Sequence, residues 1–250
     1  MQRYFLKEYP ENGRTVRFSG DEYHHIVRVM RMSKGDRLAA VFPGNRTAIC
    51  EVLSIGTHHV EAEIRIWLEE ERELPVDIIC ACALLKGDKF DWVIQKGTEM
   101  GARQFIPVAM ERSIVKVGRE KGIQKQLRWQ KIAKEAAEQA ERTAIPEVFP
   151  PCSFEECLKM ARDYPFRLAA YEEEGRSGER NRFPSLLKQL TNGDSLFLLF
   201  GPEGGFSRRE IGRLREERFV LCGLGPRILR AETAPLYALS AISFYFELLR

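Results

Sequence analysis

The sequence of 250 residues lacks any apolar segment long enough to cross a bilayer. Its longest apolar runs, Val76–Leu85 and Ala238–Phe246, fall short of the roughly 20 residues that a membrane helix needs, and Asp77 interrupts the first run. The amino terminus also lacks the apolar core of a signal peptide. These absences favour a cytoplasmic protein.

Cysteine is scarce, and its spacing fits neither a metal site nor a redox motif. None of the six cysteines forms a CxxC pair, and no histidine stands at metal-ligand spacing from any of them. Cys80 and Cys82 lie in the apolar run IICACALL, where buried thiols are common. We therefore expect core cysteines and no metal site.

The sequence also has little net charge, +3, but its basic residues are concentrated. Residues 1–50 contain nine Lys and Arg against five Asp and Glu, and residues 112–142 contain nine against four. Two basic segments are compatible with one anion-binding face, such as an RNA-binding surface, and equally with ordinary solvated surfaces. Charge alone leaves both interpretations open.

The first seventy residues predict a small β-rich unit. Runs of β-branched and aromatic residues between turns predict strands at Arg3–Leu6, Arg37–Phe42, Thr47–Ser54 and His59–Trp67, the pattern of a small barrel. The sequence Ser19-Gly-Asp-Glu22 is typical of a capping box and predicts a helix that ends near Met30. The charged stretch Glu69–Glu73 marks a linker, so we predict domains at residues 1–73 and 74–250.

From Val76 onward, short apolar strands alternate with helices, which predicts an α/β domain whose parallel sheet is covered on both faces. The predicted strands are Val76–Leu84, Gln104–Val108, Arg167–Tyr171, Ser195–Phe200 and Phe219–Leu221. The predicted helices are Asp88–Met100, Gln124–Glu141, Phe154–Ala161, Ser207–Glu217 and Thr233–Leu248. Ser207-Arg-Arg-Glu210 predicts a second capping box.

A glycine-rich loop, Gly201–Phe206, follows a buried strand and precedes a capped helix. Ligands of open α/β sheets bind outside the carboxyl ends of the strands, and glycine lets the backbone approach a ligand closely. The loop matches neither common phosphate-binding glycine motif and contains no Lys or Arg, which suits a ligand without phosphates. A purely structural turn explains the loop equally well.

A second strand-to-helix loop, Leu224–Ala234, concentrates ionisable side chains. Arg227, Arg230 and Glu232 lie within six residues, directly before the last predicted helix. Ionisable groups in such a loop are candidates for a functional site. The structural alternative is a helix start that Glu232 and Thr233 stabilise as dipole partner and cap.

The segments GPEGGFS at 201–207 and LGPRILRAETAPLYALSAI at 224–242 resemble the RsmE family of 16S ribosomal RNA uridine-N3 methyltransferases, within the SPOUT superfamily. The resemblance covers nearly the whole chain. It extends to Arg3-Tyr-Phe, His25–Arg31, Lys86 with Asp91–Gly101, Arg112-Ser113 and Lys134–Gln139.

The resemblance implies an α/β fold in which an N-terminal PUA-like β-barrel precedes a SPOUT domain with a C-terminal trefoil knot. It implies S-adenosylmethionine as the cofactor, 16S ribosomal RNA of the small subunit as the substrate, and a homodimer. The residues expected to bind the cofactor are Leu199, Phe200, Gly201, Pro202, Gly204, Gly205, Leu224, Gly225, Ile228, Leu229, Thr233 and Ala234.

Methylation of uridine N3 requires removal of its proton, either by a base or with the help of cations that stabilise the uridylate. Arg230 is the candidate for stabilising a uridylate carbonyl. Glu232 and Glu203 are candidates for orienting Arg230 or for taking the proton, and the sequence leaves these roles open. The structural alternative is a salt bridge between Arg230 and Glu232 with no contact to the base.

The residues expected to bind RNA are Arg3, Arg28, Arg31, Lys86 and Arg112. Arg28 and Arg31 lie three apart on a predicted helix and can follow phosphates, although a solvated helix face is the alternative. Two other functions compete: a SPOUT methyltransferase of tRNA or ribose, and a non-enzymatic ribosome-assembly factor on the same fold. The intact GPEGG loop favours an enzyme, since a pure RNA binder needs no cofactor pocket.

Overall fold

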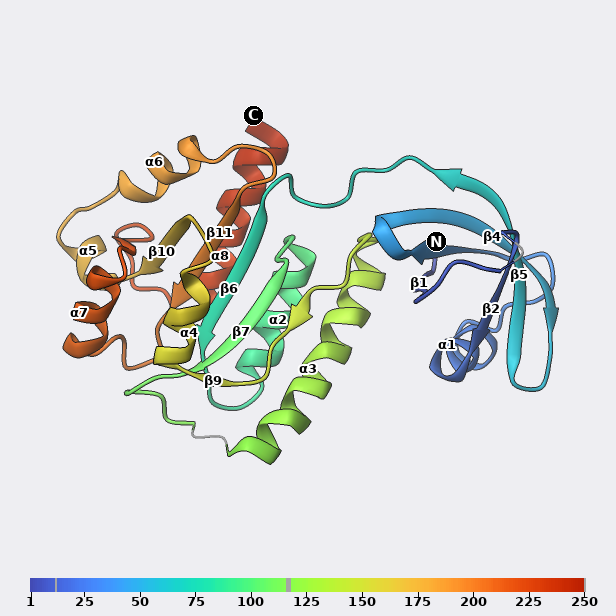
Figure 1. Ribbon diagram of the computed structural model, residues 1–250, viewed down its shortest axis with the longest axis horizontal. Helices are drawn as coiled ribbons and strands as arrows, with labels where there is room; N and C mark the ends of the chain where they lie inside the picture. Colours follow the sequence, from blue (N-terminus) through green and yellow to red (C-terminus); the bar gives the residue numbers. More distant parts are fainter. Residues whose placement is uncertain (12, 116–117, 250) are drawn as a thin grey trace. The chain divides into compact units, whose positions relative to one another are not determined.

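The computed structural model describes residues 1–11, 13–115 and 118–249 (Figure 1). The chain forms two compact units, one of Met1–Glu73 with Ala137–Ala144 and one of Leu74–Ala136 with Ile145–Arg250. The first unit thus includes Ala137–Ala144, which the predicted domains at residues 1–73 and 74–250 place in the second domain. Within the described residues, no helix is long and apolar enough to cross a membrane.

The first unit is built on a five-stranded sheet in the order β1-β3-β4-β5-β2. Its strands are β1 (Arg3–Phe5), β2 (Thr15–Ser19), β3 (Arg37–Phe42), β4 (Arg46–Ile55) and β5 (His59–Leu68). The β1–β3 pair is parallel and the other pairs are antiparallel. The strand pattern predicted a small barrel; among the described residues no pairing joins β1 to β2, so the sheet is open between these two strands.

Helix α1 (Gly20–His24) continues as the π-helix η1 (His25–Val29) and places Ile26 in the core of this unit beside Tyr4 and Phe18. The predicted capping box at Ser19 is wrong, because the Ser19 side chain makes no capping hydrogen bond. Gly20 has a φ of +60°, so the chain turns sharply between Ser19 and the helix.

The second unit contains a parallel sheet in the order β12-β10-β11-β6-β7-β8, with β9 also paired to β7. The strands are β6 (Asp77–Ala83), β7 (Gln104–Ala109), β8 (Glu147–Val148), β9 (Cys152–Ser153), β10 (Phe166–Ala170), β11 (Ser195–Phe200) and β12 (Val220–Cys222). The helices are α2 (Lys89–Glu99), α3 (Arg119–Gln139), α4 (Phe154–Ala161), α5 (Glu172–Arg176), α6 (Arg182–Gln189), α7 (Arg208–Glu216) and α8 (Thr233–Ser243), followed by the π-helix η3 (Phe244–Leu249). The parallel sheet is therefore confirmed, whereas α5 and α6 were not predicted.

Both faces of this sheet are buried because successive side chains of a strand alternate between them. In β11, Leu196, Leu198 and Phe200 join the core on one face, and Phe197 and Leu199 join the core on the other. Helices α2, α3, α6 and α8 contribute side chains to the first core, and α4 and α7 to the second. The continuous apolar run of β11 is thus the pattern of a central strand.

The capping box at Ser207 is confirmed and fixes the end of the glycine-rich loop. Ser207 Oγ accepts a hydrogen bond from the Glu210 amide at 3.2 Å, and the Ser207 amide donates to Glu210 Oε2 at 2.8 Å. Ser207 Oγ also donates to Glu111 Oε2 at 2.7 Å, and the Glu111 amide donates to Glu210 Oε1 at 2.9 Å. The start of α7 is therefore tied to the segment after β7.

A buried ion pair holds Ala137–Ala144 in the first unit. Glu73 accepts hydrogen bonds from the Arg142 guanidinium and from the amides of Thr143 (2.9 Å) and Ala144 (3.1 Å). The Arg142 side chain is 4% exposed and that of Glu73 is 22% exposed. Loss of one partner would leave a largely buried charge without compensation, which is more costly than loss of a surface pair.

We expect Arg142→Ala to lower the free energy of unfolding by about 3 kcal/mol, because Glu73 then loses its main counter-charge. Urea unfolding followed by circular dichroism measures the change. Arg65→Ala is the matched control, since Arg65 pairs with Glu51 and Glu63 at the exposed surface of the same unit and its loss should change stability little. Equal effects of the two substitutions would contradict the account.

Candidate functional site

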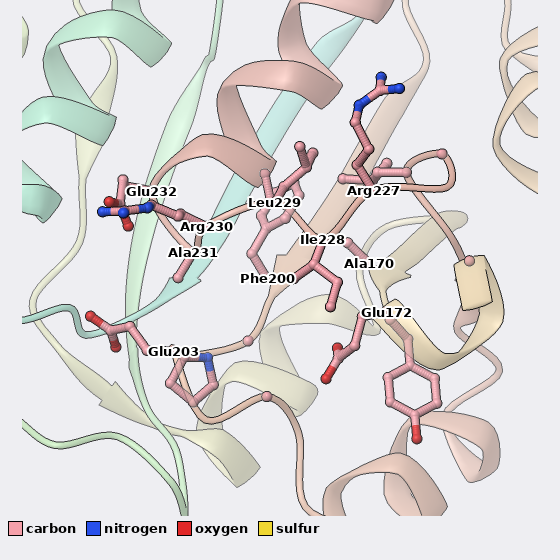
Figure 2. A pocket seen from close by; sticks show the side chains of 18 of the residues that line it. Ala170, Glu172, Phe200, Glu203, Arg227, Ile228, Leu229, Arg230, Ala231 and Glu232 are labelled. Carbon is pink, nitrogen blue, oxygen red and sulfur yellow. The ribbon is translucent and has the colours of Figure 1, made fainter.

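A cavity of about 490 Å³ opens at the carboxyl edge of the parallel sheet (Figure 2). Its walls come from the segments that follow β10, β11 and β12, with Lys89 of α2 contributed by the segment that follows β6. The lining segments are Ala170–Glu172, Gly175–Arg176, Phe200–Gly205, Leu224–Glu232 and Ala234. All of these strands are parallel, so the loops after them meet at one edge.

Glycines at and beside the cavity occupy positions where a side chain would collide with a neighbour or where φ is positive. A Cβ on Gly205, whose φ is +66°, would lie 2.5 Å from Glu172 Oε1. Gly225 has a φ of +93°, and a Cβ there would meet only Tyr237 Oη, at 3.9 Å. A Cβ on Gly223 would lie 2.4 Å from the Cα of Gly175. These positions require glycine for backbone conformation or close approach.

Three charged side chains from different segments meet at the cavity. Lys89 Nζ lies 3.4 Å from Glu203 Oε1 and 3.2 Å from Glu232 Oε2. Lys89 is the first residue of α2, Glu203 lies in the loop after β11, and Glu232 is the N-cap of α8. We call Lys89, Glu203 and Glu232 the charged triad; it joins three segments that are remote in the sequence.

The triad keeps Glu232 ionised. Burial is the largest influence and would raise the pKa of Glu232, but its own amide, Lys89 and Arg230 together outweigh burial and hold that pKa below its ordinary value. Contact with Glu232 is the largest of the causes that raise the pKa of Lys89. At neutral pH the triad therefore consists of one ammonium group and a carboxylate at Glu232.

Arg230 lies near this triad but forms no ion pair with its described residues. Figure 2 shows its guanidinium on the same side of the cavity as Glu232, with Glu203 on the neighbouring loop. Arg230 is exposed and forms no ion pair among the residues that the structure describes. The structural alternative, a salt bridge between Arg230 and Glu232, does not occur among the described residues, and Lys89 contacts Glu232 instead. The guanidinium remains available to a ligand.

The structure brings together most of the residues expected to bind the cofactor, with two exceptions. Leu199 is fully buried in the core on the opposite face of the sheet, because alternation along β11 turns it away from Phe200. Thr233 is exposed and outside the cavity lining, and its amide donates to the Arg230 carbonyl at 2.9 Å. The other ten residues expected to bind the cofactor, and Arg230, Glu203 and Glu232, all line the cavity.

Sequence reasoning missed Lys89 and the segment after β10. Glu172, Gly175 and Arg176 line the cavity although the sequence analysis singled out none of them. The rule that ligands bind at the carboxyl ends of parallel strands was applied only to β11 and β12. The same rule applied to β6 and β10 points to the segments that contain these residues. Among the described residues, no cluster of three or more His, Cys, Asp or Glu side chains could hold a metal ion.

The residues expected to bind RNA are distributed over both units. Arg28 and Arg31 are exposed in the first unit, and Lys86 is exposed after β6 in the second. Arg112 lies beside the glycine-rich loop and donates to the Gly204 carbonyl at 3.0 Å.

The structure excludes Arg3 from this group. Its side chain is 3% exposed, and its guanidinium donates to Glu70 at 2.7 Å and to the Arg142 carbonyl at 3.2 Å. Arg3 is therefore a structural residue of the first unit and is not available to phosphates.

Comparison with known proteins identifies relatives over the full chain. A family model described as RNA methyltransferase domain matches residues 72–243, and one described as RNA methyltransferase PUA domain matches residues 18–65. The ribosomal RNA small subunit methyltransferase E of Bacillus subtilis (strain 168) is 47% identical over 253 residues, which cover 100% of this chain and 99% of that protein. The enzyme of the same name from Synechocystis sp. (strain ATCC 27184 / PCC 6803 / Kazusa) is 34% identical and is matched over 74% of its length by 93% of this chain.

Solved structures of methyltransferases also match nearly the whole chain. The crystal structure of a ribosomal RNA small subunit methyltransferase E from Neisseria gonorrhoeae bound to S-adenosyl methionine has a TM-score of 0.84 at 28% identity and covers 98% of both chains. A putative methyltransferase from Legionella pneumophila in complex with SAM has a TM-score of 0.83 at 28% identity and covers 97% of both chains. The family models, the relatives and the cavity agree with the resemblance in the sequence, and the chain belongs to the RNA methyltransferase family that contains the ribosomal RNA small subunit methyltransferases E.

Proposed function

We propose that this protein uses S-adenosylmethionine to methylate N3 of a specific uridine in 16S ribosomal RNA within the small ribosomal subunit. The observation that carries the proposal is the position of Arg230 and the charged triad beside a glycine-lined cavity at the carboxyl edge of the sheet. A cofactor pocket and a group suited to uridylate thus share one site. The relatives bound to S-adenosylmethionine support the choice of cofactor.

The residues of the cavity fit S-adenosylmethionine. Its volume, about 490 Å³, lies within the range of roughly 300–1,000 Å³ that small-molecule sites occupy. The apolar side chains of Phe200, Leu224 and Leu229 suit an adenosine group, and the carboxylates of Glu172 and Glu203 suit a sulfonium or an ammonium group. When bound, the cofactor supplies an electrophilic methyl group.

The chain's own residues prepare uridine N3. Arg230 stabilises the negative charge that spreads over the flanking carbonyls as the N3 proton leaves. Glu232, held as a carboxylate, accepts that proton. Its lowered pKa makes it a weak base, so charge stabilisation by Arg230 carries much of the effect. Lys89 holds Glu232 in position, and Glu203 in turn contacts Lys89.

We further propose that the C-terminal segment forms a trefoil knot. Strand β12 pairs with β10 at one edge of the sheet, whereas α8 packs against α2 and the inner strands β6 and β11. The chain after β12 must therefore return across β10. The close approach of Gly223 to Gly175 supports a tight passage between these segments.

We also propose a homodimer that uses the exposed apolar face of α8 and η3. Tyr237, Phe244, Leu248 and Leu249 are 41%, 54%, 78% and 65% exposed. Contiguous exposed apolar side chains of this kind are typical of protein interfaces, and a second copy of the chain would cover them.

Nucleoside mass spectrometry of ribosomal RNA from cells that lack this protein tests the proposal. We expect N3-methyluridine to disappear from the 16S RNA and to return with the wild-type gene but not with an Arg230→Ala gene. Unchanged N3-methyluridine would refute the proposed reaction. Binding to the small subunit without any methylation would favour the alternative, a non-enzymatic assembly factor.

Substitution of Gly225 tests the cofactor site. We expect Gly225→Ala to weaken S-adenosylmethionine binding at least tenfold, because the new Cβ strains a left-handed backbone beside the ligand. Gly193→Ala is the matched control, since Gly193 has a similar φ of +88° and open space around it outside the cavity. Isothermal titration calorimetry distinguishes the two variants. Equal affinities in both folded variants would argue against the site.

Arg230→Ala should lower the single-turnover rate of methylation by roughly 10²–10³-fold while the cofactor affinity changes only a few fold, because the guanidinium acts on charge that develops in the transition state. Arg230→Lys should recover little of this rate, and higher pH should partly rescue the alanine variant. Arg103→Ala, which removes an exposed arginine at the opposite edge of the sheet, is the control. A wild-type rate in Arg230→Ala at neutral pH would remove Arg230 from the mechanism.

Lys89→Met should move the acid limb of the pH–rate profile to higher pH. Lys89 lowers the pKa of Glu232, whereas burial raises it. Without Lys89 the pKa of Glu232 therefore rises, and the carboxylate becomes protonated at a higher pH. Lys188→Met, an exposed substitution on α6, is the control and should leave the profile unchanged. An acid limb in Lys89→Met that coincides with the wild-type limb would show that Lys89 does not tune Glu232.

A further inference from the structure

The first unit carries a cluster of aromatic rings and one guanidinium beside the turn between β3 and β4. We call Tyr9, Phe42, Arg46 and Trp67 the aromatic platform. The centroids of Tyr9 and Phe42 lie 5.2 Å apart with an interplanar angle of 11°, and those of Phe42 and Trp67 lie 5.1 Å apart. The Arg46 guanidinium carbon lies 4.4 Å from the centroid of the Trp67 ring. None of these four residues lines the cavity of the second unit.

The platform is rigid on its inner side and open on its outer side. Phe42 is only 2% exposed, so one face of Tyr9 lies against the core of the unit. The Tyr9 hydroxyl donates to the Pro43 carbonyl at 2.9 Å and thereby fixes the ring on the turn. Tyr9 and Trp67 are nevertheless 44% and 38% exposed. Two immobilised aromatic rings therefore present accessible surface at little cost in side-chain entropy.

Arg46 brings an uncompensated positive charge to this surface. Within the described part of the chain, Arg46 is exposed and forms no ion pair with a carboxylate. Three other arginines of the same unit do form ion pairs: Arg14 pairs with Glu63, Arg65 with Glu51 and Arg72 with Glu70. The aromatic ring of Trp67 holds the guanidinium in place without neutralising it.

We propose that the aromatic platform binds one unpaired nucleotide of the RNA substrate. Exposed aromatic faces stack on nucleobases, and an unpaired guanidinium beside them matches the phosphate of the same strand. A duplex would not satisfy the platform, because its bases are stacked on one another and inaccessible to Tyr9 and Trp67. The inference rests on the proposed RNA substrate and adds a base-stacking contact to the phosphate contacts expected from Arg28 and Arg31.

Fluorescence anisotropy tests the proposal with the full-length protein and two labelled probes, octauridine and a blunt-ended RNA duplex of equal phosphate number. Stacking is nearly independent of salt, whereas phosphate contacts set the slope of affinity against salt concentration. Tyr9→Ala and Trp67→Leu should each weaken octauridine binding about tenfold at an unchanged salt slope. Arg46→Ala should weaken binding and flatten the slope by about one unit.

The duplex should bind wild type, Tyr9→Ala and Trp67→Leu alike. Ile66→Ala is the matched control: Ile66 is 52% exposed and adjoins Trp67 on β5, but strand alternation turns it to the opposite face, so octauridine affinity should not change. If Trp67→Leu fails to fold, Tyr9→Ala carries the test, because Tyr9 lies outside the strands.

Octauridine binding by folded Tyr9→Ala with wild-type affinity would overturn the platform, as would an equal loss of duplex binding. Either result would favour a protein partner, and not RNA, as the ligand of these exposed rings. Cofactor titration and methylation by wild type are measured in parallel. A wild type that stacks octauridine but methylates nothing would refute the proposed reaction and not the platform.

Discussion

The site depends on one constraint: parallel strands place all their carboxyl ends at the same edge of a sheet. The loops after β10, β11 and β12 and the start of α2 meet there although Lys89 precedes Glu203 by 114 residues of chain. Lys89 then joins the loop after β11 to the start of α8 through Glu203 and Glu232. Without that convergence neither the cavity nor the charged triad would exist.

Charged side chains also determine which groups at this edge of the sheet are available to a ligand. Lys89 pairs with both glutamates, and Arg230 forms no ion pair with any residue that the structure describes, so its charge is available to a ligand. Removal of Lys89 would alter the protonation of Glu232, whereas removal of Arg230 would alter the stabilisation of the substrate. Both cations lower the pKa of Glu232, but the proposed mechanism gives them separable roles.

Much of the fold of the second unit follows from sequence pattern. Ser195–Phe200 and Phe154–Ala161 agree with the structure residue for residue, because continuous apolar strands and amphipathic capped helices carry strong local signals. Helix α6 was missed because Pro184 lies in its first turn, where proline is tolerated but is easily taken for a break. The capping box at Ser19 was wrong because the conformation of Gly20 is not visible in the sequence.

The sequence predicted the site only in part, and each error of the prediction has a physical cause. The two loop motifs located the cavity, but treating the motif as a whole included Leu199, which alternation along β11 turns to the opposite face. Arg3 was taken as an RNA ligand because a basic residue is usually exposed, yet Glu70 and the Arg142 carbonyl enclose it. Lys89 was missed because pairing across 114 residues of sequence leaves no local pattern.

Transfer of a labelled methyl group tests the central claim most directly. Purified protein is incubated with S-adenosylmethionine labelled in its methyl group and with small ribosomal subunits from cells that lack this protein, and the nucleosides of the 16S RNA are then analysed by mass spectrometry. The account predicts labelled N3-methyluridine at a single site. Label on ribose or on another base, or no label with a folded and cofactor-bound protein, would contradict it.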